Sequence, residues 1–328
     1  MTVAAVVVTF NRRELLVECL DALHAQTRPA DVIIVIDNAS TDGTDVLLRE
    51  KYHHLRCYRS ERNLGGAGGF AWGVELALRA GYDDAWLMDD DAAPTPEALM
   101  GLLEASAQLS ATGPKPGFVA CQVVDNSGQN SSRHRLTPLA TTGTRSHSVE
   151  AVAVDCAHFV GALINLDIAR RTHLPVPDFF LWHDDIEYTT RLGEMATGYL
   201  VPGSLIHHPD KPELNDYGWR LFHDVKNRVW MMKTPQLANR HARIAAFKRI
   251  PKILLQQAIR AESKTGFLRH ALRGLFIGLV KKPALFLPGE LLASSNDVRL
   301  VANGSERHGV AYAAVPIVDD SDRDCDDD

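Results

Sequence analysis

The sequence predicts an α/β protein with a mainly parallel central sheet flanked by helices. Short, uninterrupted apolar runs alternate with segments that have the spacing of amphipathic helices. Apolar runs of this kind are typical of strands that are buried on both faces of a sheet. Polar residues also follow several of these runs directly, and ligands of such sheets bind at the carboxyl ends of the strands.

The first part of the chain supplies these elements in regular alternation. Strands are predicted at residues 3–8, 31–36, 55–59 and 85–88, and helices at residues 12–25, 44–51 and 67–80. In the first helix, apolar residues recur on one face, namely Leu15, Leu16, Cys19, Leu20 and Leu23. Residues 125–150 are rich in Ser, Thr, Gly and Asn and predict a mobile loop. After this loop, ordered segments are predicted at residues 151–154 and 158–166, and a further helix is predicted at residues 188–196.

The composition is that of a soluble protein of enzyme size. The chain has 328 residues, 45% hydrophobic and 23% charged, so it can bury a large core. Its five cysteines are scattered without CxxC spacing, which argues against a disulfide framework or a zinc site. We expect neither a signal peptide nor a membrane span, because the chain opens with a strand-like run and lacks an uncharged apolar stretch of about 18 residues. These features predict a cytoplasmic protein.

The net charge of −6 hides a strong asymmetry along the chain. Residues 239–282 hold 11 Lys and Arg but a single acid, whereas residues 318–328 hold seven Asp and one Arg. We therefore predict a catalytic domain (1–235), a basic helical region (236–300) and an extended or disordered acidic tail (301–328). The remainder of the chain is negative, which argues against nucleic acid as a partner.

Three consecutive acids are the most informative feature. Asp89, Asp90 and Asp91 follow the apolar run 85–88, which places them at the carboxyl edge of a buried strand, and no cation neighbours them in sequence. Because side chains alternate along a strand, Asp89 and Asp91 should point to the same side. A divalent cation would remove their repulsion, and oxygen ligands suit Mg²⁺ or Mn²⁺. A solvated acidic turn is the simpler alternative.

A glycine-rich segment, residues 63–71, opens the third predicted helix. Gly66, Gly68 and Ala71 match a dinucleotide-binding fingerprint, but that fingerprint must directly follow a strand, and residues 60–63 intervene here. A P-loop is also excluded, because GxxxxGK[ST] does not occur in the chain. The glycines can instead let a ligand approach a helix N-terminus, or let the helix pack closely on the sheet.

Two later segments offer a third metal ligand and a base. His208 has an imidazole that could complete a metal site with the acids, although a His before Pro is more often structural. Asp185 follows an apolar run, His183 and Asp184, so its pKa could be raised into the range of a general base. The alternative for Asp184 or Asp185 is a helix N-cap, and one residue could do both.

In combination, these motifs resemble the inverting glycosyltransferases of family 2, which have the GT-A fold. The resemblance covers roughly residues 3–230. It is carried by six segments, which are Thr9-Phe10-Asn11, Ile36-Asp37-Asn38, Asn63-Leu64-Gly65-Gly66, Asp89-Asp90-Asp91, Trp182-His183-Asp184-Asp185 and His207-His208. Within the family, the segment NLGGAGGF, the triple aspartate and the W-x-D-D element are most similar to bacterial galactofuranosyltransferases. Rhamnosyltransferases of the same family are close behind.

The resemblance implies a role for each matching residue. Asp185 would be the catalytic base, and Asp184 would contact acceptor or donor hydroxyls. Asp89, Asp91 and His208 would hold Mn²⁺ or Mg²⁺. The residues implied to bind the nucleotide-sugar donor are Thr9, Asp37, Asn63, Gly65, Gly66 and Asp90. Residues 226–228 resemble an element near the donor diphosphate.

The function implied by the resemblance is that of a metal-dependent hexosyltransferase. It would move galactofuranose from UDP-galactofuranose to a cell-envelope glycan or a lipid-linked acceptor. The chain lacks the extra domains of the large polymerising galactofuranosyltransferases, so we expect it to add one or a few sugars. Three alternatives stay open, namely a rhamnosyltransferase using dTDP-rhamnose, a non-catalytic sugar-nucleotide-binding protein and a glycosidase with two carboxylates.

The basic region has apolar residues at helical spacing among its Lys and Arg, at Phe247, Ile250, Leu254 and Ala258. Such helices often lie on anionic membranes, and a lipid-linked acceptor would make peripheral contact with the inner face of the plasma membrane useful. The equal alternative is a helix packed on the catalytic domain with a solvated basic face. Pro251 predicts a break or kink in this helix.

Overall fold

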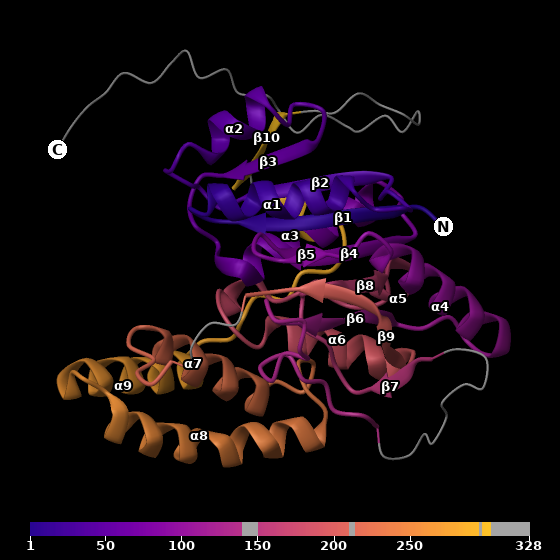
Figure 1. The fold of residues 1–328 in the computed structure, drawn as a ribbon. Coiled ribbons are helices and arrows are strands. Elements are labelled where there is room, and N and C mark those ends of the chain that lie inside the picture. The colour runs from indigo at the N-terminus through magenta and orange to yellow at the C-terminus, as the bar shows by residue number, and fades with distance from the viewer. Residues whose placement is uncertain (140–149, 210–213, 295–296, 303–328) are drawn as a thin grey trace.

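The structure is a computed structural model that describes residues 1–139, 150–209, 214–294 and 297–302 (Figure 1). The strands are β1 (Val3–Thr9), β2 (Val32–Asp37), β3 (Arg56–Ser60), β4 (Asp84–Asp89), β5 (Ala93–Pro94), β6 (Phe118–Val124), β7 (Val152–Val154), β8 (Ala162–Asn165), β9 (Gly198–His207) and β10 (Val298–Ala302). The helices are α1 (Arg13–His24), α2 (Thr44–Glu50), α3 (Gly65–Arg79), α4 (Ala98–Thr112), α5 (Leu166–Ala169), the 3₁₀ helix η1 (Pro177–Phe179), α6 (Asp184–Met195), α7 (Arg220–Lys233), α8 (Arg240–Arg260), α9 (Lys264–Val280) and α10 (Glu290–Ser294).

The strands join in one mixed sheet, in which β1, β2, β3, β4, β6 and β9 run in the same direction and β5, β7, β8 and β10 run the opposite way. Its order is β10-β3-β2-β1-β4-β8-β6-β9-β5, and β7 pairs with β9. The pairs β1–β2, β1–β4, β2–β3 and β6–β9 are parallel, whereas β8 is antiparallel to both of its neighbours. Because β8 reverses direction between β4 and β6, these two strands point the same way, and so do β1, β2, β3 and β9. Their carboxyl ends therefore lie along one edge of the sheet.

Helices cover both faces of the sheet, which explains the uninterrupted apolar runs (Figure 1). Alternate residues of β1 enter different cores, with Val3, Ala5 and Val7 on one side and Ala4, Val6 and Val8 on the other. The first core is completed by α1, α2 and α4, and the second by α3, α5, α6 and α10. Each predicted element within residues 3–88 is confirmed to within one or two residues at either end.

Two glycines of α3 let this helix lie close against β1. A Cβ added to Gly69 would come within 2.4 Å of Val8 Cγ1, and one added to Gly73 within 2.2 Å of Val6 Cγ1. Any larger residue would push the helix away from the strand. Part of the glycine-rich segment therefore serves helix–sheet packing, which was one of its two predicted roles.

The C-terminal part forms a separate layer of helices and then returns to the sheet. Helices α7, α8 and α9 pack together beside the sheet, and the chain then runs back to pair β10 antiparallel with β3 (Figure 1). The sequence did not predict β10, and residues 303–328 of the predicted acidic tail lie outside the described residues. Helix α8 runs through Pro251 without ending there. The division into three parts stays a prediction. Within the described ranges, no helix is both long enough and apolar enough to cross a bilayer.

Candidate active site

The acid triplet lies where the ends of β1, β2 and β4 meet. Thr9 of β1 pairs in register with Asp37 of β2, and the end of β1 also lies beside Asp89 of β4. His208 directly follows β9 and reaches the same edge from the other half of the sheet. Its backbone N–H donates to the last residue of β6 at 2.9 Å, which fixes it there. The parallel topology thus gathers polar residues that are far apart in the sequence.

Asp89, Asp91 and His208 form a cluster that can hold a metal ion. One ligand atom from each lies within 4.8 Å of the other two, and no second cluster of this kind occurs in the part of the chain that the structure describes. His208 Nε2 is 3.1 Å from Asp91 Oδ1, and both of these side chains are buried. The structure therefore brings together the three residues that were predicted as metal ligands.

The electrostatics of this cluster favour a bound cation. Burial raises the pKa of Asp89 to about 7, and the neighbouring carboxylates of Asp91 and Asp90 add to the shift. A cation placed among these ligands would remove that repulsion. The two carboxylates are donors that suit Mn²⁺ or Mg²⁺, and the imidazole adds a ligand of the kind that divalent transition metals accept. The residues present therefore fit the metal that the sequence implies.

The Asp90 side chain points toward the end of β1, where a hydroxyl and a backbone N–H hold its carboxylate. Its Oδ2 accepts hydrogen bonds from the Thr9 hydroxyl at 2.8 Å and from the Phe10 N–H at 3.3 Å. Arg12 Nη1 lies 3.0 Å from Asp90 Oδ1 and 3.0 Å from Asp91 Oδ2. A cation from the β1–α1 connection thus neighbours the triplet in space, although none does in sequence. Thr9 and Asp90 are buried against each other, and their contact with a donor stays a prediction.

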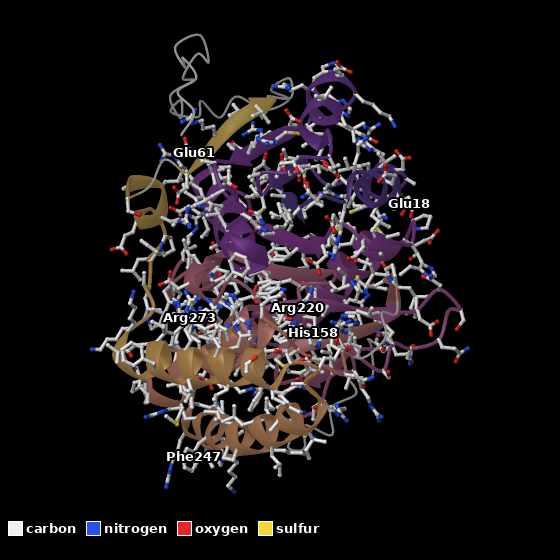
Figure 2. The ribbon with its side chains drawn as sticks, turned by 90° about the vertical axis from the view of Figure 1, so that its left-hand side faces the viewer. Glu18, Glu61, His158, Arg220, Phe247 and Arg273 are labelled. Carbon is white, nitrogen blue, oxygen red and sulfur yellow. The ribbon has the colours of Figure 1, made fainter. Side chains whose placement is uncertain are left out.

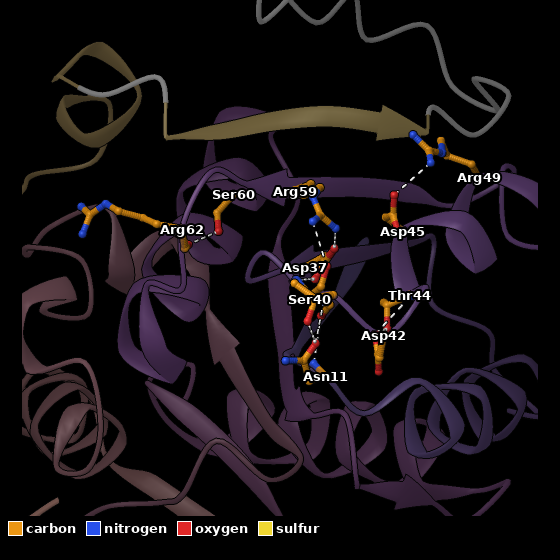
Figure 3. Close-up of polar contacts among 11 residues, drawn as sticks. Asn11, Asp37, Ser40, Asp42, Thr44, Asp45, Arg49, Arg59, Ser60 and Arg62 are labelled. Atoms are coloured by element: carbon orange, nitrogen blue, oxygen red, sulfur yellow. Dashed lines mark hydrogen bonds and ion pairs between the residues drawn. The ribbon is translucent and has the colours of Figure 1, made fainter. Parts of the chain in front are cut away.

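Asp37 is fully buried and pairs with an arginine from the next strand (Figure 3). Arg59 Nη1 is 2.7 Å from Asp37 Oδ2, and Asp37 Oδ1 accepts from the Ser40 N–H at 2.9 Å. The Arg59 side chain is 30% exposed, whereas that of Asp37 is 0% exposed. Arg59 is therefore the member of this pair that solvent, and so a ligand, can reach. Sequence reasoning missed it, because only the pairing of β2 with β3 brings it to Asp37.

The glycine-rich segment begins α3 at the same edge of the sheet. The Asn63 side chain accepts from the Gly65 N–H at 2.8 Å, and Asn38 Nδ2 donates to Gly65 O at 2.9 Å. Gly65 has a φ of +71°, and a Cβ there would lie 2.0 Å from Phe180 O, so only glycine fits. A Cβ on Gly66 would meet no atom within 4 Å. The helix start therefore has open space at Gly66, and the contact of this segment with a donor diphosphate stays a prediction.

Asp184 and Asp185 begin α6, with His183 at the N-cap position, so neither aspartate is the N-cap that was considered. Asp185 Oδ2 is 2.8 Å from His158 Nδ1, and its Oδ1 accepts from the Ile186 N–H at 2.7 Å. Burial acts to raise the pKa of Asp185, but these hydrogen bonds and the charge of His158 outweigh it and lower the pKa. The predicted upward shift is therefore wrong for Asp185. The upward shift occurs at Asp184 instead. Burial and the charge of Asp185 raise the pKa of Asp184 well above its usual value.

Comparison with known proteins decides the family. The family model described as "Glycosyl transferase family 2" matches residues 4–170, about half of the chain. The chain belongs to glycosyltransferase family 2. The galactofuranosyltransferase GlfT1 of Mycolicibacterium smegmatis is 34% identical, over 72% of this chain and 84% of its own length. GlfT1 of Mycobacterium tuberculosis is 33% identical over the same shares. By this relationship the protein is a hexosyltransferase.

Solved structures of other glycosyltransferases have the same fold. Residues 1–349 of S. aureus TarS align with a TM-score of 0.54 at 15% identity, covering 85% of this chain and 81% of that one. The mannosyltransferase PcManGT from Pyrobaculum calidifontis aligns with a TM-score of 0.50 at 18% identity, covering 85% and 87%. At these identities the likeness shows the fold alone. This family 2 glycosyltransferase has the GT-A fold that its motifs implied.

A strained loop precedes the acid pair of the glycosyltransferase. Phe180, Trp182 and His183 have positive φ values of 65°, 66° and 73°, in a region that L-residues rarely adopt. Asn227 of α7 holds this loop, because its Nδ2 donates to the carbonyls of residues 179, 181 and 182 at 3.1, 2.9 and 3.0 Å. Helix α7 thus fixes the backbone from which Asp184 and Asp185 project. Such strain is typical of functional sites.

The side chains around Asn227 take part in the same support. Lys226 donates to Asp178 O and lies 4.3 Å from the centre of the Trp230 ring. His183 Nε2 is 2.8 Å from Asp224 Oδ1, and Arg228 Nε donates to the same carboxylate at 3.1 Å. The structure therefore engages residues 226–228 in holding the loop. Their predicted contact with the donor diphosphate stays a prediction.

Two further histidines of the glycosyltransferase border the site, and no motif pointed to either. The His134 ring lies edge-on at 4.7 Å from that of His208 and at 5.1 Å from that of His158. Burial lowers the pKa of His134 to about 3, and the charges of His158 and His208 contribute to this shift. His134 comes from the segment predicted as a mobile loop, of which residues 140–149 lie outside the described residues. His134 thus lies between His208 of the candidate metal cluster and His158, which contacts Asp185.

Proposed function

We propose that this protein is a metal-dependent inverting glycosyltransferase that moves galactofuranose from UDP-galactofuranose to a cell-envelope glycan or a lipid-linked acceptor. One observation carries the proposal, which is the cluster of Asp89, Asp91 and His208, linked through His134 to the pair of His158 and Asp185. The 34% identity to GlfT1 supports galactofuranose as the sugar. The similar mannosyltransferase PcManGT was solved with GDP-Man and Mn²⁺, and TarS was solved with UDP-GlcNAc.

The donor half of the site uses the ends of β1, β2 and β3 together with the start of α3. Arg59, oriented by the buried Asp37, presents its guanidinium toward the nucleoside. The open backbone at Gly66, in the first turn of α3, faces the diphosphate. Asp90 and Thr9 hold each other and so fix the edge of β1 against which the donor lies.

Asp89, Asp91 and His208 would hold Mn²⁺ or Mg²⁺ beside the diphosphate. When bound, the ion supplies Lewis-acid stabilisation of the negative charge that develops on the departing nucleoside diphosphate. The three side chains hold their ligand atoms close together at a buried edge. The burial of Asp91 and His208 strengthens electrostatic interactions relative to water, which favours a leaving group that carries several charges.

Asp185 acts on the other side of the sugar ring. As an ionised carboxylate with a lowered pKa, it accepts the proton of the acceptor hydroxyl while that oxygen attacks the anomeric carbon. The bond to the diphosphate oxygen breaks on the opposite face, so the configuration inverts. Asp184, whose raised pKa keeps its proton longer, is suited to donate a hydrogen bond to a sugar hydroxyl.

A screen of nucleotide sugars tests this proposal. Purified protein with Mn²⁺ and membrane-derived acceptors should release UDP from UDP-galactofuranose, and chelation by EDTA should stop the release. Release of dTDP from dTDP-rhamnose instead would make the protein a rhamnosyltransferase. Binding of a nucleotide sugar without transfer would favour the non-catalytic alternative, and release of free sugar from an oligosaccharide without nucleotide would favour a glycosidase.

We also propose that α8 and α9 rest on an anionic membrane surface, where a lipid-linked acceptor would lie. Each helix carries a second, exposed apolar stripe besides its buried face. The stripe residues are Ile244, Phe247, Leu255 and Ile259 on α8 and Leu268, Leu272, Phe276, Leu279 and Val280 on α9. Figure 2 shows Phe247 at the outer surface of α8. Lys and Arg flank both stripes, and Glu262 is the single acid of residues 239–282.

Co-sedimentation with vesicles tests this location. The protein should sediment with vesicles that contain anionic phosphatidylglycerol and much less with neutral phosphatidylcholine vesicles. Replacing Leu255 and Ile259 by Glu should lower the anionic-vesicle affinity by about 10-fold or more, because each loses the burial of a large apolar side chain. Val46→Glu is the matched control, since Val46 is an exposed apolar residue on α2. Equal sedimentation of all three proteins would refute the membrane contact.

A further inference from the structure

His158 contacts the proposed base directly, and the reaction as derived above does not account for it. It lies in the connection between β7 and β8, and its Nδ1 is 2.8 Å from Asp185 Oδ2. The His158 side chain is 24% exposed and that of Asp185 is 22% exposed. Both are therefore near the surface of the site, where an acceptor can reach the carboxylate, rather than inside the core.

We propose that His158 is a positioning residue for the base, which donates its Nδ1–H to Asp185 and fixes the direction in which that carboxylate meets the acceptor hydroxyl. This inference rests on the proposed role of Asp185. It adds a residue that none of the motifs assigns.

The hydrogen bonds of Asp185 show how the carboxylate is fixed. A carboxylate turns readily about its last side-chain bond unless both of its oxygens are held. Here Oδ1 accepts from the Ile186 N–H of α6, and Oδ2 accepts from His158 on a different element. Each oxygen keeps a further lone pair for the acceptor. Orientation of this kind matters, because small misplacements of a reacting group cost large factors in rate.

The Thr189 hydroxyl connects the backbone next to His158 with the backbone of Asp185. The Ala157 N–H donates to Thr189 Oγ1 at 2.9 Å, and Thr189 Oγ1 lies 2.9 Å from Ala157 O and 2.7 Å from Asp185 O. Thr189 is fully buried and stands one helical turn after Asp185. The residue before His158 is thus tied to the turn that carries Asp185. The pairing of imidazole and carboxylate is therefore built into the fold.

The charged and titratable groups around the pair fit this role. Four such groups surround His158. They are Asp185 on α6, His134 and Arg133 in the segment after β6, and Asp89 at the end of β4. Burial lowers the pKa of His158, but the hydrogen bond and charge of Asp185 outweigh this and raise the pKa. The pKa of Asp185 moves in the opposite direction, downward. Both shifts favour Nδ1–H as the donor and an ionised carboxylate as the acceptor.

Substitution of His158 by Asn and by Ala separates this role from that of a space-filling residue. The Asn amide can place an N–H near the position of Nδ1, whereas Ala has no donor. We expect H158A to lower kcat by about 10- to 100-fold, the range seen when a partner that orients a working ligand is lost. H158N should stay within about 3-fold of wild type, because a neutral N–H donor still holds Oδ2. The KM for the donor and the affinity for UDP with Mn²⁺ should not change in either variant.

Further variants keep the test decisive. If H158A does not fold, H158Q takes its place, because the Gln amide reaches the position of Nε2 rather than Nδ1 and should lose activity. His173→Ala is the control, since His173 is a buried histidine whose ring nitrogens hydrogen-bond to backbone carbonyls. Thermal unfolding of every variant identifies losses that come from instability. H173A should keep its turnover.

Three results would overturn the inference, and they can be told apart. Full activity of H158A beside an inactive D185N would overturn the positioning role and leave the proposed function intact. Equal losses in H158N and H158A would overturn it as well, since the imidazole itself would then be required. Undiminished transfer by D185N would remove the base assignment on which the inference rests.

Discussion

Two acidic pairs of this protein sit at opposite ends of secondary-structure elements and have different proposed roles. Asp89 and Asp91 end a buried strand, whereas Asp184 and Asp185 begin a helix. Each pair has a histidine beside it, His208 at 3.1 Å in the first case and His158 at 2.8 Å in the second. In the described residues, only the first pair belongs to a three-residue cluster that can hold a metal ion.

The difference comes from what surrounds each carboxylate. At the strand end, burial and like charges raise the pKa of Asp89, and a cation would offset that cost. At the helix start, the Ile186 N–H and His158 satisfy both oxygens of Asp185 and lower its pKa. The lowered pKa of Asp185 means that this carboxylate is ionised without help from a cation, whereas the raised pKa of Asp89 means that a cation would offset its unfavourable surroundings. In the proposed function, the same residue type therefore serves as a metal ligand in one place and as a base in the other.

The largest effect that would test this contrast is expected at Asp91. Asp91→Ala removes one of two carboxylate ligands, so Mn²⁺-dependent binding of UDP should weaken by at least about 100-fold. Isothermal calorimetry of UDP with and without Mn²⁺ measures this. Asp45→Ala is the control, because it removes an acid from the exposed pair with Arg49 on α2 and should leave UDP binding unchanged. Undiminished affinity in D91A would remove the metal site.

The second effect separates chemistry from binding. Asp185→Asn keeps the shape of the side chain but cannot take a proton, so turnover should fall by about 10²- to 10⁴-fold while UDP affinity stays within about 2-fold. Steady-state kinetics and calorimetry on the same preparation measure both. Asp184→Asn is the matched control and should cost less, because the pKa of Asp184 is already raised. Loss of UDP binding in D185N would mean that the two pairs share one task.

A smaller effect is expected from the cation beside the first pair. Arg12 lies 3.0 Å from both Asp90 and Asp91, and its side chain is 42% exposed. Its positive charge opposes a metal ion at the same acids, so Arg12→Gln should tighten the binding of Mn²⁺ alone by about 3- to 5-fold after allowance for solvent screening. Arg13→Gln removes the adjacent charge outside these ion pairs and should change little. Weaker Mn²⁺ binding in R12Q would show that Arg12 chiefly orders the acids.

Most of the fold could be predicted from the sequence, because strands that are buried on both faces of a sheet are uninterrupted apolar runs in the sequence. Apolar runs such as Val3–Thr9 alternate with helices of regular spacing, and every element up to Asp89 was found. Strand β10 could not be predicted, since it is a short segment near the C-terminus whose partner, β3, lies more than two hundred residues earlier. Pairing at that separation has no local signal.

Some residues of the candidate site could likewise be predicted from the sequence, and others could not. Residues in compact motifs, such as Asp89 and Asp185, could be named from the sequence. Arg12, Arg59, His134 and His158 could not, because each acts through a partner that only the folded chain brings near. The direction of the Asp185 pKa shift was wrong for that reason. Burial could be inferred from the preceding apolar run, but the hydrogen bond from His158 could not.

The smallest expected effect concerns stability and pH. A raised pKa at His158 contributes stability below the ordinary His value of about 6.5, and this is lost as the pH rises through the folded-state pKa. A lowered pKa at Asp185 contributes stability above the ordinary Asp value of about 3.9, and this is lost as the pH falls. The pair should therefore stabilise most between about pH 4 and 6.5. H158A should lose about 1 kcal/mol there, or roughly 2–4 °C in Tm, and less at pH 8.5.

His173 provides a control of opposite sign for the same measurement. Burial, followed by the charge of Arg191, lowers the pKa of His173, so its neutral form is the stable one in the folded protein. Its contribution is present above the ordinary His value and falls at acid pH, when the unfolded chain binds the proton more readily. The destabilisation of H173A should therefore shrink as the pH falls from 8.5 to 5, whereas that of H158A should grow. Parallel pH dependence of the two variants would show that His158, like His173, is merely buried and not paired with an ionised Asp185.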